Sequence, residues 1–342
     1  MDIMEEDTRT PLNSMPNEIT LAEDGDVILI LRGRRYRVSS VVLSLASPVF
    51  KTMFGLNFLE GQAVRSAEQP KEISLTDGHS TPMLLALMHF TNTEELQAMD
   101  ENLIIAHPGD VAHIAGAADQ YCCTRPMSAT IEGLLRRIAQ DVIPGESPQD
   151  QIVTYAYSAT CAYLVGSKDV FADATRCLVL DGTMRFSELA GLDICHRLPF
   201  SVLRLEEQRS TVHNSIITWF DSMTNRGCFN PSCSAGSVCT KFQQEMRRIL
   251  KDSNWPPLWR STSIRSVLQD LDAAGDIALG TEARCQHGIV TVLPHSGTLR
   301  LCKFIREVVC GMCLVCARQD KAQSTCEHVE DLKKQAAHHA FF

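Results

Sequence analysis

Residues 26–54 read DVILILRGRRYRVSSVVLSLASPVFKTMF, and this stretch decides the fold. Its apolar run Val27–Leu31 contains only Val, Ile and Leu, which predicts a strand buried on both faces. The Arg-Gly-Arg that follows predicts a hairpin turn, because its glycine can take a positive φ angle. In the return strand Tyr36 and Val38 alternate with arginines, so one face of this strand should be buried and the other exposed.

Two short helices should complete this stretch. The first begins near Ser39 and Ser40, and the second begins after Ser47, an N-cap residue that is followed by proline. The second helix carries apolar side chains whose spacing forms one face: Val49, Phe50, Met53 and Phe54. No pattern in the stretch is typical of catalysis, and we interpret it as the start of a compact scaffold.

The bulk composition narrows the class of protein. The chain has 342 residues, enough for about two domains, and its 44% hydrophobic and 21% charged content is that of an ordinary soluble protein. A net charge of −9 does not favour a general nucleic-acid-binding surface. The sequence has no apolar run of about 20 residues that could span a membrane and no secretory signal. We therefore expect a location in the nucleus or cytoplasm, where the 14 cysteines would be mostly reduced.

The pattern continues beyond residue 54 with further short elements. Ile73-Ser74-Leu75 predicts a short strand that Asp77-Gly78 ends, and Thr81-Pro82 begins a helix. Another helical segment starts at Asp110 and ends in Ala117-Ala118-Asp119-Gln120-Tyr121, where the small residues permit close helix packing.

In this order, these segments resemble the BTB/POZ domain over residues 21–124. Matching residues that define the fold are Asp26, Val27, Ser47, Pro48, Phe50, Met53, Phe54, Asp119 and Tyr121. The resemblance implies an α+β fold, in which a small sheet is combined with a cluster of short helices. It also implies a function in protein–protein interaction, through a homodimer or a heterodimer. The sequence FGLNFLEG at 54–61 resembles that of fungal BTB proteins most.

The sequence departs from the family at two places. Ser39-Ser40 stand where the family usually has His-Lys, so the basic member of the charged pocket of some family repressors is missing, although Asp26 matches the acidic member. The N-terminal strand and helix that many members exchange between subunits are not evident in residues 1–20. Both departures argue against a strand-swapped dimer of the repressor type.

The remainder of the chain divides into regions of different character. We expect a disordered acidic tail over residues 1–20, the BTB/POZ domain over 21–124, an all-helical extension over 125–222, and a Cys-rich, mostly helical region over 223–342.

The triplet Phe58-Leu59-Glu60 follows the second helix. It resembles the loop through which cullin-binding members of the family contact the cullin scaffold. The resemblance implies that Phe58 enters a pocket of the partner and that Glu60 orients the loop, which would make the protein a substrate adaptor of a cullin-type ubiquitin ligase. The alternative is that Phe58 packs on the core of its own domain while Glu60 is only solvated.

A group of cysteines near the C-terminus has a spacing that could bind structural zinc, with His328 nearby. The candidate ligands are Cys310, Cys313, Cys316 and Cys326. The alternative places the first three at the end of an apolar helix over residues 299–315, where small buried cysteines are ordinary core residues. Apart from this zinc, the sequence predicts no cofactor.

Catalytic signatures are missing from the sequence: it has no Gly-x-Ser-x-Gly, no phosphate-binding Gly-rich loop and no His-Glu-x-x-His. We therefore predict an interaction protein rather than an enzyme. Besides the ligase adaptor, two hypotheses stay open. One is a pure oligomerisation module, and the other is a nuclear, transcription-related regulator with a structural zinc site in its C-terminal region.

Overall fold

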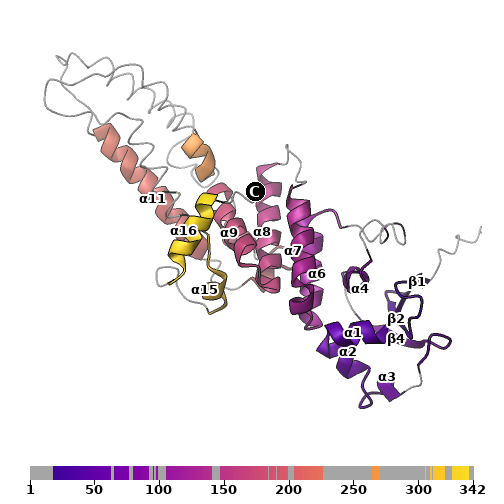
Figure 1. Cartoon of the computed structure of the whole chain (residues 1–342). Coiled ribbons are helices and arrows are strands. Elements are labelled where there is room, and N and C mark those ends of the chain that lie inside the picture. The colour runs from indigo at the N-terminus through magenta and orange to yellow at the C-terminus, as the bar shows by residue number, and fades with distance from the viewer. Residues whose placement is uncertain are drawn as a thin grey trace, which may run out of the picture. The chain divides into compact units, whose positions relative to one another are not determined.

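The structure is a computed structural model of the whole chain (Figure 1). Apart from the single residues 95, 98, 305 and 309, it describes these ranges: 18–62, 65–76, 80–91, 105–140, 147–183, 185–189, 191–198, 204–225, 263–269, 311–319 and 326–338. The chain forms two compact units: residues 1–106 with 113–131, and residues 107–112 with 132–342.

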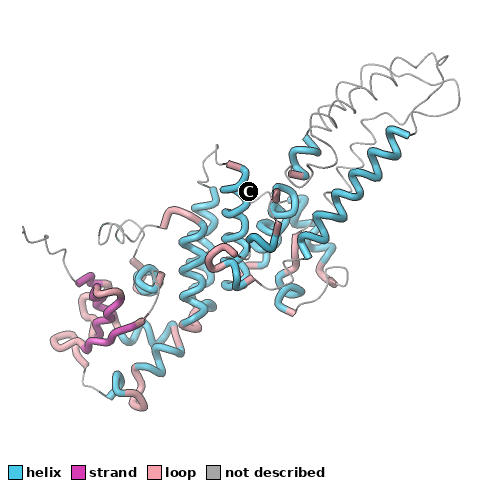
Figure 2. The backbone as a smooth tube through the Cα atoms, turned by 180° about the vertical axis from the view of Figure 1, so that it is seen from behind, coloured by secondary structure: helices cyan, strands magenta, loops and turns pink. Residues whose placement is uncertain are grey.

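The first unit contains one small mixed sheet, drawn in magenta in Figure 2. Its strands are β1 (Glu18–Thr20), β2 (Val27–Leu31), β3 (Arg34–Val38) and β4 (Lys71–Leu75), in the order β1-β3-β2-β4. The central strand β2 pairs antiparallel with β3 and parallel with β4, and four of its five side chains are buried. This burial confirms the strand predicted from its unbroken apolar run.

The hairpin between β2 and β3 turns at Arg32 and Gly33, whose φ angles are 51° and 78°. Positive φ at both central residues is the geometry of a type I′ turn, which matches the twist of the flanking strands. In β3, Tyr36 and Val38 are buried while the arginines are partly exposed, as the alternation predicted. Arg35 reaches across the sheet to the carboxylates of Glu18 and Glu72.

Strand β1 lies in residues that the sequence pattern assigns to the acidic tail. It pairs parallel with β3 in the same chain, with Ile19 opposite Tyr36. This strand has only three residues, and only Ile19 among them is buried. Its alternation of polar and apolar residues is too short to be recognised in a polar segment.

Short helices accompany the sheet and lead into the longer ones. They are α1 (Ser40–Ala46), α2 (Pro48–Met53), α3 (Leu59–Gln62), α4 (Thr81–Met88), α6 (Pro108–Gln120) and α7 (Thr124–Gln140). As predicted, Ser39 caps α1 and Ser47 caps α2 ahead of Pro48. Phe50 is fully buried, and its ring stacks on that of Tyr121 with 4.6 Å between centroids. The core of the first unit therefore joins α2 to the end of α6.

The second unit is helical in its described residues. Its elements are α8 (Pro148–Val165), α9 (Lys168–Asp181), α10 (Phe186–Leu189), a 3₁₀ turn (Cys195–Arg197), α11 (Arg204–Asn225), α15 (Leu314–Arg318) and α16 (Val329–His338). Helices α8 and α9 pack together, and Gly166 between them ends α8 with a φ of 85°. The predicted helical extension is therefore confirmed, and no described helix is long and apolar enough to cross a membrane.

Candidate metal centre and interaction surfaces

The C-terminal cysteines lie at a break in the chain rather than inside a helix. Gly311 has a φ of +80°, and Cys313 has an extended backbone as the N-cap residue of α15. The continuous helix that the apolar pattern predicts over residues 299–315 is therefore wrong at its C-terminal end, because the chain turns at this glycine. Cys313 and Cys316 consequently stand on a turn and the first helical turn after it, a common setting for metal ligands.

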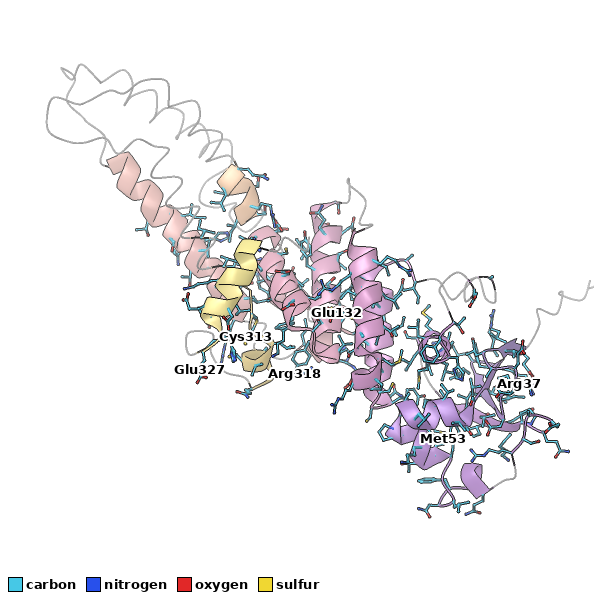
Figure 3. The ribbon with its side chains drawn as sticks, viewed as in Figure 1. Arg37, Met53, Glu132, Cys313, Arg318 and Glu327 are labelled. Atoms are coloured by element: carbon cyan, nitrogen blue, oxygen red, sulfur yellow. The ribbon has the colours of Figure 1, made fainter. Side chains whose placement is uncertain are left out.

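Four side chains converge at this point, in the part of the chain where Figure 3 labels Cys313. The Sγ atoms of Cys313, Cys316 and Cys326 and a ring nitrogen of His328 all lie within 4.8 Å of one another. Nδ1 of His328 lies 3.7 Å from Sγ of Cys313 and 4.0 Å from Sγ of Cys326. The structure thus brings together three of the four predicted ligands and adds a histidine, while Cys310 lies outside the described residues.

The four side chains of the cluster differ in burial, from the core to the surface. Cys313 and Cys316 are buried, Cys326 is partly buried and His328 is exposed. The two buried cysteines pack with Ala172 of α9 and Leu332 of α16. Burial, together with hydrogen bonding to Cys326, raises the pKa of Cys316 to about 12. The neighbouring thiols thus disfavour ionisation of Cys316, a tendency that a bound cation would reverse.

A second set of contacts fixes the N-terminus of α1. The carboxylate of Asp26 accepts hydrogen bonds from the backbone N–H of Ser40 at 2.8 Å and from its hydroxyl at 2.6 Å. The N–H of Ser39 donates to Nε2 of His89 at 3.1 Å, and the other ring nitrogen lies 2.7 Å from the carbonyl of Leu85. Burial lowers the pKa of His89, consistent with a neutral ring that accepts at Nε2. Asp26 therefore holds the start of α1 through two hydrogen bonds to Ser40.

The outer side of α1 is apolar. Val41 is 65% exposed and Leu45, one helical turn later, is 84% exposed, whereas Leu43 of the same helix is fully buried. Residues four apart lie on one helix face, so these two aliphatic side chains form a single exposed surface, the α1 face. An exposed pair of large aliphatic side chains on one face is a candidate protein contact.

The loop between α2 and α3 is held by a close approach of two glycines. A Cβ atom at Gly61 would lie 1.9 Å from the carbonyl oxygen of Gly55, so only glycine fits. The N–H of Gly61 donates to the carbonyl of Phe58, and that of Phe58 donates to Gly55. Leu56 is 80% exposed and Phe58 is 46% exposed, so the loop presents apolar side chains outward.

The family model of the BTB/POZ domain matches residues 19–136 of this chain. This segment is a BTB/POZ domain. Comparisons with curated proteins and with solved structures gave no match. The match extends from the short strand β1 almost to the end of α7, so it includes residues before and after the predicted range of 21–124. The likeness to fungal members stays a prediction.

The residues predicted to define the BTB/POZ domain have distinct positions in it. Most of them are buried, as a role in folding requires: Val27, Ser47, Phe50, Phe54 and Tyr121. Met53 is partly buried and Asp119 is exposed at the end of α6. Of the predicted cullin contacts, Phe58 is partly exposed, while the side chains of Leu59 and Glu60 lie outside the described residues. The α1 face was missed, although Val41 and Leu45 stood at helical spacing in the sequence.

Proposed function

We propose that this protein acts by protein–protein interaction and that its BTB/POZ domain self-associates through the α1 face. BTB/POZ domains generally serve as interaction modules, and residues 19–136 are such a domain. The observation that carries the proposal is the exposed pair Val41 and Leu45 on a helix whose opposite side is anchored in the core by Leu43. The occupant of this face is a second copy of the chain.

Val41 and Leu45 are large enough that burying them in a dimer would add measurably to its stability. Burying an aliphatic side chain of this size is worth about 2 kcal/mol, so a symmetric pair of α1 faces would gain about 8 kcal/mol from four such side chains. This gain offsets a large part of the roughly 4 to 15 kcal/mol that association loses in translational and rotational freedom. Contacts around the pair must supply the rest.

The test compares the wild-type chain with a Val41→Glu, Leu45→Glu double variant by sedimentation equilibrium. Placing like charges at the centre of the contact should raise the dimer dissociation constant by about 1,000-fold or more. The matched control is Leu56→Ser, which removes an equally exposed leucine from the α2–α3 loop and should leave the dimer intact. A wild-type chain that stays monomeric at high micromolar concentration, or a double variant that dimerises as well as the wild type, would refute self-association through α1.

We propose as a second interaction that residues 58–60, which run from the α2–α3 loop into α3, contact a cullin, which would make the protein a substrate adaptor of a ubiquitin ligase. The support is the outward exposure of Phe58 on a loop whose backbone is fixed by the Gly55–Gly61 contact. A preorganised loop loses little conformational freedom on binding, which favours its use as an anchor.

The loop is tested by the variant Phe58→Ala, Glu60→Ala in an affinity purification from cells. Cullin should co-purify with the wild type and with the α1 double variant, and should be lost from the loop variant. As a control for folding, the loop variant should show the same sedimentation equilibrium as the wild type. Equal cullin recovery from the wild type and the loop variant, or no recovery from either, would contradict the adaptor role without touching self-association.

A further inference from the structure

The segment that carries Cys313 and Cys316 is docked onto α8 and α9 at both of its ends. At the N-terminal end a Cβ atom on Gly311 would lie 1.9 Å from the carbonyl oxygen of Ala172, and the N–H of Met312 donates to the hydroxyl of Thr175 at 2.8 Å. This contact is buried. The approach is so close that only glycine fits at position 311.

At the other end of the segment, Arg318 fixes α15 to α8. Its guanidinium donates to the carbonyl of Tyr163 at 2.6 Å and lies 5.6 Å from the centroid of the Tyr163 ring. Cys313 and Cys316 lie between these two anchored points, so their positions are set by contacts that involve no metal. Half of the four-residue cluster is therefore preorganised.

The other half of the cluster precedes α16, whose described side chains make little apolar contact. Among the side chains of α16 that the structure describes, Val329 to Lys333, only Leu332 is buried. One buried leucine is worth about 2 kcal/mol, which is less than the entropy lost when even a few residues are ordered. An additional link at Cys326 and His328 would therefore help to hold the start of α16 in place.

The spacing of the four ligand atoms is close to that of a tetrahedral zinc site. With Zn–S bonds of about 2.3 Å and a Zn–N bond of about 2.0 Å, neighbouring ligand atoms lie about 3.5 to 3.8 Å apart. The observed separations of 3.7 Å and 4.0 Å between His328 Nδ1 and two of the sulfurs fall close to this range. All pairs lie within 4.8 Å, so small side-chain rotations suffice to close the site.

We propose that one structural Zn²⁺ ion is bound by four side chains of the second unit: Cys313, Cys316, Cys326 and His328. Three thiolates and one imidazole are a donor set that selects zinc among the common divalent ions and fills all four positions, which leaves none for a substrate. On binding, each of the three thiols releases its proton to solvent and His328 binds as the neutral imidazole through Nδ1. The ion ties the start of α16 to the segment that α8 and α9 already hold.

Ordinary packing of free thiols explains this arrangement less well than a metal does. Packing accounts for the buried Cys313 and Cys316, but it gives no reason for an exposed histidine to turn Nδ1 toward two sulfurs. A tetrahedral metal site at the edge of the core explains why the four side chains range from buried cysteines to an exposed histidine. The site is independent of the α1 face, so its test succeeds or fails whether or not the chain dimerises.

The test is elemental analysis of the full-length protein, purified under reducing conditions and dialysed against trace metal-free buffer. The wild type should contain about one equivalent of zinc. Cys313→Ser and Cys326→Ser should each lose this equivalent, and His328→Ala should lose most of it. His328→Cys should keep the equivalent, because a fourth thiolate preserves tetrahedral coordination. The matched control is Cys122→Ser, which changes an exposed cysteine of the first unit and should leave the zinc content unchanged.

Two further readouts separate metal binding from folding. Replacement of zinc by Co²⁺ should give the intense thiolate-to-cobalt absorption of a Cys₃His site, and this absorption should be absent from Cys313→Ser. Metal removal should raise hydrogen exchange in residues 326–338 while α8 stays protected. A wild-type protein that binds no zinc when reconstituted in reducing buffer, or ligand variants that retain the full equivalent, would overturn the proposal.

Discussion

Ser47→Ala tests whether a single hydroxyl joins two distant parts of the BTB/POZ domain. The Ser47 hydroxyl is fully buried, donates to the carbonyl of Tyr121 at 2.7 Å and accepts from the N–H of Phe50 at 3.1 Å. It therefore caps α2 and also satisfies a carbonyl at the end of α6, 74 residues away in the chain. Alanine keeps the Cβ atom but removes the hydroxyl and with it both bonds.

The expected loss of stability has two parts. Replacing an N-cap serine by alanine costs about 1 kcal/mol. Leaving the buried carbonyl of Tyr121 without a donor costs about 1 to 3 kcal/mol more, because solvent does not reach it. The free energy of unfolding of the first unit should fall by about 2 to 4 kcal/mol, which is a large share of the roughly 5 to 15 kcal/mol of an ordinary domain.

Hydrogen exchange followed by mass spectrometry measures this loss in the full chain. Amides of β2 and β3 that exchange through global opening of the first unit should exchange about 30- to 700-fold faster in Ser47→Ala, since each 1.4 kcal/mol is a factor of ten. Amides of α8 and α9, in the second unit, should not change. Ser39→Ala is the matched control, because its hydroxyl caps α1 with a longer 3.5 Å bond and is only partly buried. Similar acceleration by both variants would refute the proposed link between Ser47 and Tyr121.

Two other perturbations follow from the described geometry. Gly61→Ala should destabilise the α2–α3 loop by about 1 to 3 kcal/mol, because its Cβ would overlap the carbonyl of Gly55, and exchange of residues 54–62 should report it. Gly133→Ala, in open space on α7, is the control and should be neutral or stabilising. Burial and the charge of Arg209 lower the pKa of His213 to about 4, below its unfolded value of about 6.5. Stability that His213 contributes is thus present above pH 6.5 and lost as pH falls toward 4, so α11 in His213→Gln should show a flatter pH dependence of exchange.

The BTB/POZ domain was predictable because its signals are local. An unbroken apolar run gives β2, the Ser-Pro pair fixes the start of α2, and both act over a few residues. The positive φ of Arg32 could not be foreseen in the same way, since arginine has no preference for it and the twist of β2 and β3 imposes it. The exposure of Val41 and Leu45 also depends on which side of α1 meets the core, and that side is chosen by the tertiary packing of Leu43.

The proposed zinc ligands show where the local pattern fails. Spacing alone favours Cys310, because three cysteines then repeat every third residue, and an apolar run up to Val315 favours an uninterrupted helix. What decides the site is the turn at Gly311, and the reason for that turn is the carbonyl of Ala172, more than a hundred residues earlier in the chain. Once the chain bends there, Cys313 and Cys316 face the Cys-x-His pair at 326–328. A Cys-x-x-Cys beside a Cys-x-His is therefore the sequence signal for the proposed ligands. The glycine two residues before the first cysteine is the signal that the helix ends.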